Sequence, residues 1–586
     1  MSVACLLFAS MFAFGACGGG GDSTGDSGSH SGNSGSGDSG NAEDKGYLDV
    51  QPLDLGEGFN SEYYPVLGKA GGIQKQSGKI DVVILFEGTE PGWEAVANEY
   101  QRLHPQVVVK LDNQWTASNY EDKLNGELDN NKTTDWDIVQ GNLAAQGKTA
   151  DSCVNMNNYI TTKNGYAGGK YWAQVLEQNA YISDQTGGNS STYIMNTEGL
   201  ETAWFVNDVA FKEAVAAGYS AKDNNGQPAK PRTWTELIDL CKYMEAAGYT
   251  DPLGISLTTD SIGASQFTWL LRVYGDLYYR NEYNKIMTNG SEFKVDLTDP
   301  ETEKDSEYNV SDPKLINSIF NEDLLYGDNY VGATSDKFQE FIEQFGMMTP
   351  YIREDAKSTS LVEMRNLFQF QDEGKASPQI ILDYVGAGLG FVSSKAIETD
   401  FFDYPMMESE RFIAPNTLIR DVGGNGGYLS VVDHGDRAQN MLAVDFIKFF
   451  MSPYGQTIYY DGLSAKGVAP KGLTLVKNDL VRIPQAWKDF FETDKISFTG
   501  LSDSNPYITW FIRGLSNGSA SSAKLEYLWS NFLTNKDGTG AVNKDNFGGQ
   551  WFDALFLEDW PNFCKKEGWN EHCWKYPEQD SVDYGG

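Results

Sequence analysis

Histidine is scarce in this chain: 586 residues contain only His30, His104, His434 and His572. No H-E-x-x-H sequence is present, so a helical zinc-protease site is excluded, and a histidine-based catalytic triad has little material to work with. A glycoside hydrolase needs only a pair of carboxylates, so the scarcity of histidine leaves that class open.

Cysteine is scarce too, with six residues and no C-x-x-C pair, which argues against a zinc ribbon. Cys564 and Cys573 could close a small disulfide loop in an oxidising exterior, or remain free buried thiols. The acidic stretches DNNGQ at 223 and NKDGTG at 535 lack the ligand spacing of a calcium loop, so we interpret them as solvated turns. We expect no metal site and no cofactor.

Basic residues are outnumbered, 45 Lys and Arg against 82 Asp and Glu, and the formal net charge is -37 at pH 7. This balance argues against a nucleic-acid partner and against adsorption to anionic lipid, because both would repel the surface. It favours solubility outside the cell. Apart from residues 3–14, no apolar run approaches the length of a membrane-spanning helix.

The N-terminus combines a short apolar run with a cysteine. Residues 3–14 are apolar or small, Gly15 and Ala16 follow, and Cys17 precedes a Gly, Ser, Asp and Asn segment that continues to residue 44. The arrangement resembles a bacterial lipobox, which implies a signal peptide over 1–16 and a lipid on Cys17. The segment 17–44 cannot bury enough apolar surface to fold, so we expect a disordered tether. The alternative is an ordinary secretory signal with a chance cysteine.

Alternating elements begin at residue 79. The run KIDVVILF predicts a buried strand, and the next segment places Trp93, Val96, Ala97 and Tyr100 on one helical stripe. VVVKLD then predicts a second strand, and DWDIVQGN at 135–142 a third. Strand, helix and strand at this spacing predict a parallel α/β sheet with right-handed crossovers.

A second region repeats this character. Thr233 and Glu236 form a predicted capping box before a helix whose buried stripe is Trp234, Leu237, Ile238 and Cys241, and Gly248 ends it. PLGISL and YLSVV at 428–432 predict strands. The segment 437–451 predicts a helix with a stripe of Ala438, Leu442, Phe446 and Phe449, and we interpret the polar segment 290–335 as a surface insertion.

Seven segments between about residues 79 and 535 form an ordered set: WEAVANEYQRLHPQVVVKL, TAWFVNDVAFKEAV, PRTWTELIDLCKYMEAAGYTDPLGISL, FTWLLRVYGD, FQDEGKASPQIILDYVG, GGNGGYLSVVDHGDRAQNMLAVDFIKFFMSPYGQ and ITWFIRGLSNG. Together they resemble the family 1 bacterial extracellular solute-binding proteins, the maltose-binding-protein-like receptors of ABC importers. The resemblance implies an α/β fold of two lobes joined by a hinge, with the ligand between them. We expect an N-terminal extension at 45–78, a first lobe from 79–200 and 427–475, and a second from 201–426 and 476–586.

The resemblance also implies a function and a site. We expect a monomeric lipoprotein, anchored on the outer face of the cytoplasmic membrane, that passes a carbohydrate, favoured as an oligosaccharide, to ABC permease subunits. Aromatic rings stack on sugar faces, and carboxylates, amides and guanidiniums bind hydroxyls. The expected ligand contacts are Glu87, Glu90, Asn142, Gln266, Trp269, Asp383, Tyr384, Trp510 and Arg513, with no catalytic residue.

Two alternatives stay open. A lipid-anchored glycoside hydrolase could recruit Glu87, Glu90 and Asp383 as its carboxylates. A glycan-capture protein without a transport role would use the same binding fold. Trp93 and Trp234 lie on helix stripes, so we assign them to the core.

Overall fold

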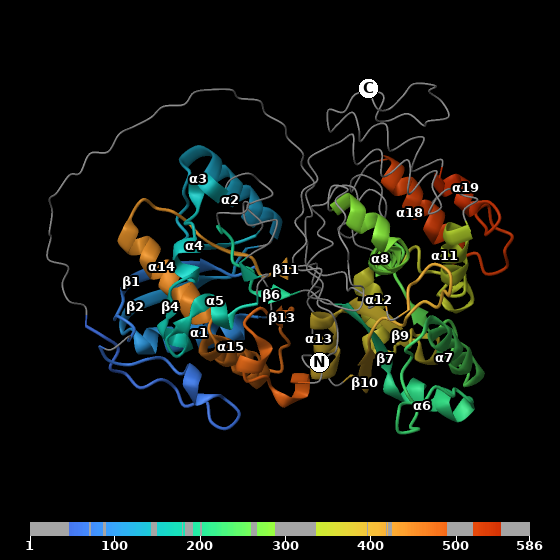
Figure 1. The fold of residues 1–586 in the computed structure, drawn as a ribbon, viewed down its shortest axis with the longest axis horizontal. Coiled ribbons are helices and arrows are strands. Elements are labelled where there is room, and N and C mark those ends of the chain that lie inside the picture. The colour runs from blue at the N-terminus through green and yellow to red at the C-terminus, as the bar shows by residue number, and fades with distance from the viewer. Residues whose placement is uncertain are drawn as a thin grey trace.

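The computed structural model describes residues 46–69, 72–85, 89–115, 117–141, 149–177, 180–181, 192–199, 202–258, 266–287, 336–394, 396–415, 417, 419, 425–488 and 520–552. Two lobes of mixed helix and sheet lie side by side (Figure 1). The predicted tether with Cys17, the whole segment 290–335, Cys564 and Cys573 fall outside the described residues.

The first lobe is built on a four-stranded sheet with the order β12-β3-β1-β2. The strands are β1 (Ser77–Val83), β2 (Gln106–Asp112), β3 (Ile138–Gln140) and β12 (Leu429–Val431). β1 pairs in parallel with both β2 and β3, whereas β12 is antiparallel to β3. The predicted strand–helix–strand unit is therefore confirmed.

Helices cover both faces of this sheet (Figure 1), and short 3-10 turns and the hairpin of β4 (Lys163–Asn164) and β5 (Lys170–Tyr171) complete the lobe. The helices are α1 (Glu90–Leu103), α2 (Ala117–Asn131), α3 (Thr149–Ser152), α4 (Asn157–Ile160), α5 (Trp172–Val175), α14 (Arg437–Phe450) and α15 (Pro453–Ala465). The predicted stripe of α1 is buried, including Trp93. The stripe of α14 needs one correction, because Ala438 lies in its first turn and is exposed, while Leu442, Phe446 and Phe449 are buried.

Two flanking segments pack on the first lobe. In the N-terminal extension, Leu55 and Phe59 join its core, and the backbone N–H of Leu53 donates to the hydroxyl of Tyr454 at 2.7 Å. Residues 476–488 also pack here, although the sequence placed them in the second lobe. The reason is an ion pair of Arg482 with Asp461 of α15, and the burial of Val481. Trp487 in addition donates its indole N–H to Ser393 of α13 (Val385–Ser394) at 3.1 Å.

The second lobe has a four-stranded sheet with the order β10-β7-β9-β8. The strands are β7 (Thr202–Asn207), β8 (Leu253–Gly254), β9 (Ile380–Tyr384) and β10 (Thr399–Phe402). Successive residues alternate between two apolar clusters: Trp204 and Leu382 belong to one, and Phe205 and Ile381 to the other. Both faces are thus buried, as continuous apolar strands require.

Helices on both sides of this sheet account for that burial. They are α6 (Asp208–Ala217), α7 (Trp234–Ala246), α8 (Gln266–Met287), α11 (Asp336–Gly346), α12 (Leu361–Phe370), α13 (Val385–Ser394), α18 (Ala520–Leu533) and α19 (Phe547–Phe552). The capping box of Thr233 and Glu236 on α7 is confirmed, and Trp234 is core. Among the described helices, none combines the length and apolarity needed to cross a bilayer.

A small sheet links the two lobes, and we call it the connector. It consists of β6 (Glu198–Gly199), β11 (Asn425–Gly426) and β13 (Leu473–Thr474), with β6 in the centre. The chain enters the second lobe after β6 and returns before β11 (Figure 1). One apolar cluster runs from the first lobe across the connector to α12 and α13, so these two helices lie on the side of the second lobe that faces the first.

Candidate functional site

Open α/β sheets bind ligands at the carboxyl ends of parallel strands, so a ligand site is expected there. In the first lobe these ends are Val83, Asp112 and Gln140. The predicted contacts Glu87 and Asn142 belong to the loops that follow β1 and β3, and both lie outside the described residues. Glu90 is described: it is the first residue of α1 and is half-buried.

An aromatic group that the sequence reasoning missed follows β2. Trp115 is half-buried and lies edge-on to Trp136 at 5.3 Å between ring centroids. The ammonium of Lys123 is 4.2 Å from the centroid of Trp136, and the Trp136 indole N–H donates to Asp112 at 3.1 Å. Burial raises the pKa of Asp112, but the hydrogen bonds it accepts outweigh this effect and lower the pKa. The sequence signal that could have identified this group is a tryptophan three residues beyond the end of the predicted strand VVVKLD.

The carboxyl end of β9 in the second lobe holds a buried ion pair. The Asp383 carboxylate is fully buried and accepts two hydrogen bonds from Arg365 of α12, from Nε and, at 2.7 Å, from Nη2. Its Oδ1 also accepts from the backbone N–H of Tyr384 at 2.8 Å. Asp383, a predicted ligand contact, is therefore occupied within the lobe. Arg365 was missed because it lies on another element, 18 residues away.

Tyr384 keeps part of its ring exposed beside this pair. The ring is half-buried, and the Arg365 guanidinium carbon is 4.8 Å from its centroid. The site adjoins the connector, because a Cβ on Gly386 would come within 1.9 Å of the carbonyl oxygen of Lys471, next to β13, and 2.9 Å of a Tyr384 ring carbon. The edge of the second sheet thus meets the hinge at Tyr384.

Two further predicted residues lie at the start of α8. Gln266 is fully buried: its amide nitrogen donates to the carbonyl of Leu382, and its oxygen accepts from the backbone N–H of Ser256. Its side chain therefore links the segment that follows β8 to β9. Trp269 is half-buried and packs against the core of the second lobe. Trp510 and Arg513 lie outside the described residues.

The connector itself contains a buried acid. Glu198 is 7% exposed, and its Oε2 has no hydrogen-bond partner among the described residues. Burial raises the pKa of Glu198 to about 8, although Lys471 opposes this shift. The carboxyl group is therefore mostly protonated at neutral pH, in the centre of the hinge.

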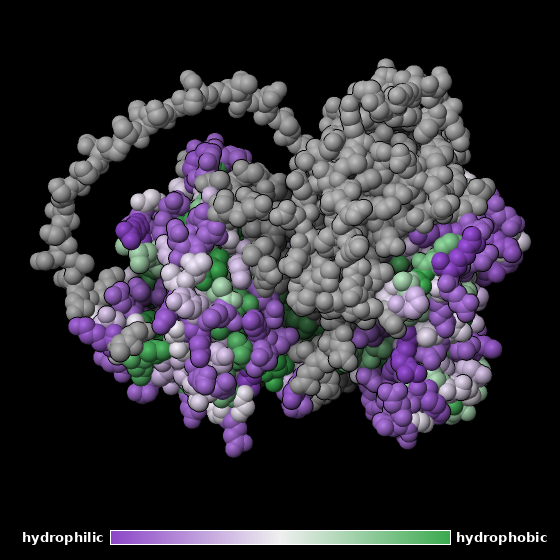
Figure 2. All heavy atoms as spheres, viewed as in Figure 1, coloured by the Kyte–Doolittle hydropathy of each residue, from purple (hydrophilic) through white to green (hydrophobic). Residues whose placement is uncertain are grey.

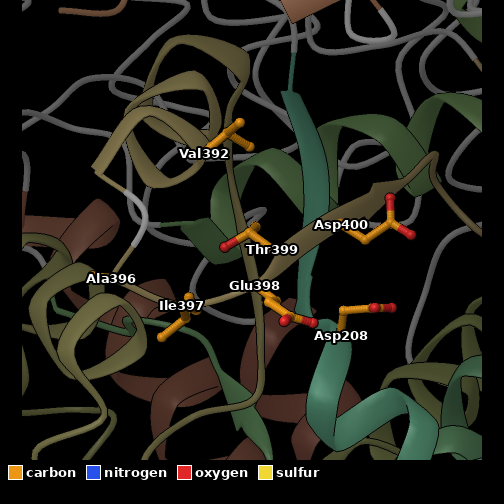
Figure 3. A pocket seen from close by; sticks show the side chains of 7 residues that line it. All are labelled: Asp208, Val392, Ala396, Ile397, Glu398, Thr399 and Asp400. Carbon is orange, nitrogen blue, oxygen red and sulfur yellow. The ribbon is translucent and has the colours of Figure 1, made fainter. Parts of the chain in front are cut away.

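A cavity of about 530 Å³ lies elsewhere, where β7 meets α6 and β10 begins (Figure 3). Three carboxylates line it, but Lys212 contacts Asp208 at 2.7 Å and Lys230 contacts Asp400 at 2.7 Å. Its acids are thus largely compensated, and it lies away from the carboxyl ends of the parallel strands. Neither its charge nor its position indicates a ligand.

Metal binding has little support in the part of the chain that the structure describes. No group of three or more His, Cys, Asp or Glu side chains there could hold an ion. In the stretch at 223, the Asp223 carboxylate accepts the backbone N–H groups of Asn225 and Gln227, as in a turn. The visible surface of both lobes is mainly hydrophilic, with scattered apolar patches (Figure 2).

Comparisons with known proteins give structural likeness only. No protein-family model matches the chain, and no curated protein does. Solved structures similar to it include a family 1 extracellular solute-binding protein from Bifidobacterium longum subsp. infantis, with 13% identity and a TM-score of 0.48 over 82% of this chain and 99% of that one. A probable secreted solute-binding lipoprotein from Streptomyces coelicolor has 13% identity and a TM-score of 0.49, over 81% and 98%.

A third similar structure is the binding protein of an ABC transporter from Bifidobacterium animalis subsp. lactis in complex with mannobiose, with 14% identity and a TM-score of 0.44 over 82% and 95%. The first two of these similar structures are thus named as solute-binding proteins, and the third is named as the binding protein of an ABC transporter.

Proposed function

We propose that this protein is an extracellular binding protein that captures a carbohydrate between its two lobes and delivers it to the permease of an ABC importer. The observation that carries the proposal is the edge of the second sheet, where the half-buried ring of Tyr384 is held against Arg365 next to the connector. An aromatic face beside hydrogen-bonding groups suits a sugar, which has both C–H faces and hydroxyls.

The two-lobed plan supports a binding role. Each lobe has its own sheet, and the connector has only two residues in each strand. Closure of two rigid lobes about such a short link is a common way to enclose a ligand. In the first lobe, Trp115 supplies a second half-buried aromatic ring at the carboxyl end of β2.

The membrane-related part of the proposal rests on the sequence. The lipobox-like segment before Cys17 and the polar tether to residue 44 would hold the protein near a permease. A glycan-capture protein without a permease partner would share this anchor. Pull-down of permease subunits with the protein would support the transport function over glycan capture alone. Labelling with a radioactive fatty acid, in the native chain and in Cys17→Ser, tests the anchor directly.

The hydrolase alternative has weaker support. Of the three carboxylates it would recruit, Asp383 is fully buried and already bound by Arg365, so it is unsuited to act as a nucleophile or proton donor. Turnover of chromogenic glycosides by the purified chain would restore this alternative.

The direct test is a thermal-shift screen followed by isothermal calorimetry with mannotriose, raffinose, xylotriose and a set of short peptides. A ligand at a hundred times its Kd stabilises the folded state by about 2.7 kcal/mol, enough to raise the melting temperature measurably. Binding of a glycan class supports the proposal. Binding of peptides alone would support the role as a binding protein but would reject carbohydrate as its ligand.

A further inference from the structure

Arg365 has a hydrogen-bonding edge that its buried partner does not use. Asp383 occupies Nε and one hydrogen of Nη2, in the parallel geometry of a bidentate pair. A guanidinium has five N–H donors in a planar fork, so Nη1 and the second hydrogen of Nη2 point away from Asp383. Among the described residues, no acceptor contacts Nη1, and 16% of the side chain remains exposed.

The position of Arg365 is fixed from three sides. Its carboxylate partner is fully buried and held by the backbone N–H of Tyr384. The Tyr384 ring covers one face of the guanidinium at 4.8 Å. The adjacent residues of α12, Met364 and Phe368, are buried in the cluster that continues to the connector. A donor fixed in advance in this way loses little entropy when it binds a ligand.

We propose that the second edge of Arg365 binds a pair of neighbouring hydroxyls on an uncharged sugar, with the exposed part of the Tyr384 ring against the sugar face. This inference rests on the proposed function and adds the ligand class, a neutral glycan as opposed to an acidic one. The sequence reasoning assigned no role to Arg365.

The charge of the pair selects the neutral ligand. Asp383 compensates the guanidinium at hydrogen-bond distance, so Arg365 offers donors without a free positive charge. The chain also carries a formal charge of -37, which disfavours the approach of an anion. A sugar hydroxyl oxygen can accept a hydrogen bond from a guanidinium whose charge is already compensated. The carboxylate of a uronic acid would need an uncompensated cation to offset its loss of hydration.

The experiment measures affinity by calorimetry for the full chain and its Arg365→Lys variant. The probes are mannotriose, raffinose, xylotriose and the acidic trisaccharide trigalacturonate. For the neutral trisaccharide that binds most tightly to the native protein, we expect Arg365→Lys to weaken binding at least tenfold, because lysine retains the charge but not the planar fork. Arg411→Lys is the matched control, since Arg411 is an exposed arginine on the same lobe, paired with Asp336, and should bind as the native protein does.

A structural role alone would also lower affinity, so a second readout is required. Analogues of the bound trisaccharide that each lack one hydroxyl are compared between the two proteins. The native protein should lose about tenfold for the analogue that lacks a hydroxyl of the contacted pair, and Arg365→Lys should not distinguish that analogue from the parent. If Arg365→Lys is unfolded, the double variant Arg365→Gln/Asp383→Asn replaces it, because two amides retain a buried hydrogen bond without charge.

Each outcome is decisive. Equal affinity in the native and variant proteins, or trigalacturonate binding as tightly as the neutral probes, overturns the role of Arg365 and leaves the proposed function in place. Unchanged discrimination among the deoxy analogues in the variant does the same. Failure of every glycan to bind the native protein overturns the proposed function and this inference with it.

Discussion

The two lobes place side chains at equivalent sheet edges but hold them by different means. In the first lobe, the half-buried Trp115 is held by packing against Trp136, with Asp112 and Lys123 nearby. In the second, Tyr384 rests on a guanidinium that a fully buried carboxylate fixes. Under the proposed function, ligand recognition and stability are therefore separable at the first edge, whereas at the second edge the same ion pair would serve both.

The largest effect on stability is expected for Asp383→Ala. Removal of the carboxylate leaves Arg365 with little solvent and no counter-ion, so we expect a loss of about 3 kcal/mol in the free energy of unfolding. Chemical denaturation measures it. Asp336→Ala, which removes an exposed ion pair on the same lobe, should cost less than about 1 kcal/mol. Equal losses in the free energy of unfolding would show that the buried ion pair stabilises the protein no more than the exposed one does.

A second effect concerns the connector between the two edges. Between about pH 4.5 and pH 8 the folded protein keeps a proton on Glu198 that the unfolded chain has released, so this residue lowers stability as pH rises through that window. We expect Glu198→Gln to be more stable than the native protein by about 2 kcal/mol at pH 6, and equally stable at pH 4. Melting curves of both proteins across this range check the sign. A constant difference at all pH values would refute the assignment.

Gly386→Ala tests the contact between the second edge and the connector. The added Cβ would overlap the carbonyl of Lys471, so the lobes must shift apart locally, at a cost of about 1–2 kcal/mol. We expect weaker ligand binding as well, because Tyr384 adjoins the same contact. Gly390→Ala, on the same helix with open space at the added Cβ, is the control: it should leave ligand binding unchanged and raise stability by up to about 1 kcal/mol, because alanine favours a helix over glycine. Equal behaviour of the two variants would contradict the contact.

The smallest stability effect is expected for Trp115→Ala. Because this ring is only half-buried, its removal should cost about 1 kcal/mol in unfolding free energy. If the first edge contributes to recognition, the affinity for the bound trisaccharide should nevertheless fall about tenfold in calorimetry. Tyr527→Ala removes an exposed ring of the second lobe and should change neither quantity. A large loss of stability with unchanged affinity would show that Trp115 stabilises the first lobe and does not contribute to ligand binding.

Local signals predicted much of the fold. The stripe of α1, the strands on either side of it and the capping box of α7 depend on neighbouring residues, and the structure confirms them. The connector escaped prediction because its strands have only two residues each, too few for any periodicity. The placement of residues 476–488 depends on contacts of Arg482 with distant segments, Asp461 and Leu55.

The site was predicted less completely. The sequence located the end of β9, but the partner of Asp383 lies on a different helix, and no local pattern connects the two. It also could not show that the Gln266 amide is used between strands. Glu87, Asn142, Trp510 and Arg513 stay predictions, because they lie outside the described residues.

The pairing of β12 with β3 has a consequence for how the protein is made. Ile138 and Val431 are neighbours in one sheet, yet most of the second lobe lies between them in the chain. During synthesis, the first lobe cannot complete its sheet until most of the second lobe has been translated. Contacts so distant in sequence close slowly. The edge of β3 therefore lacks its β12 partner until residues 429–431 have been translated.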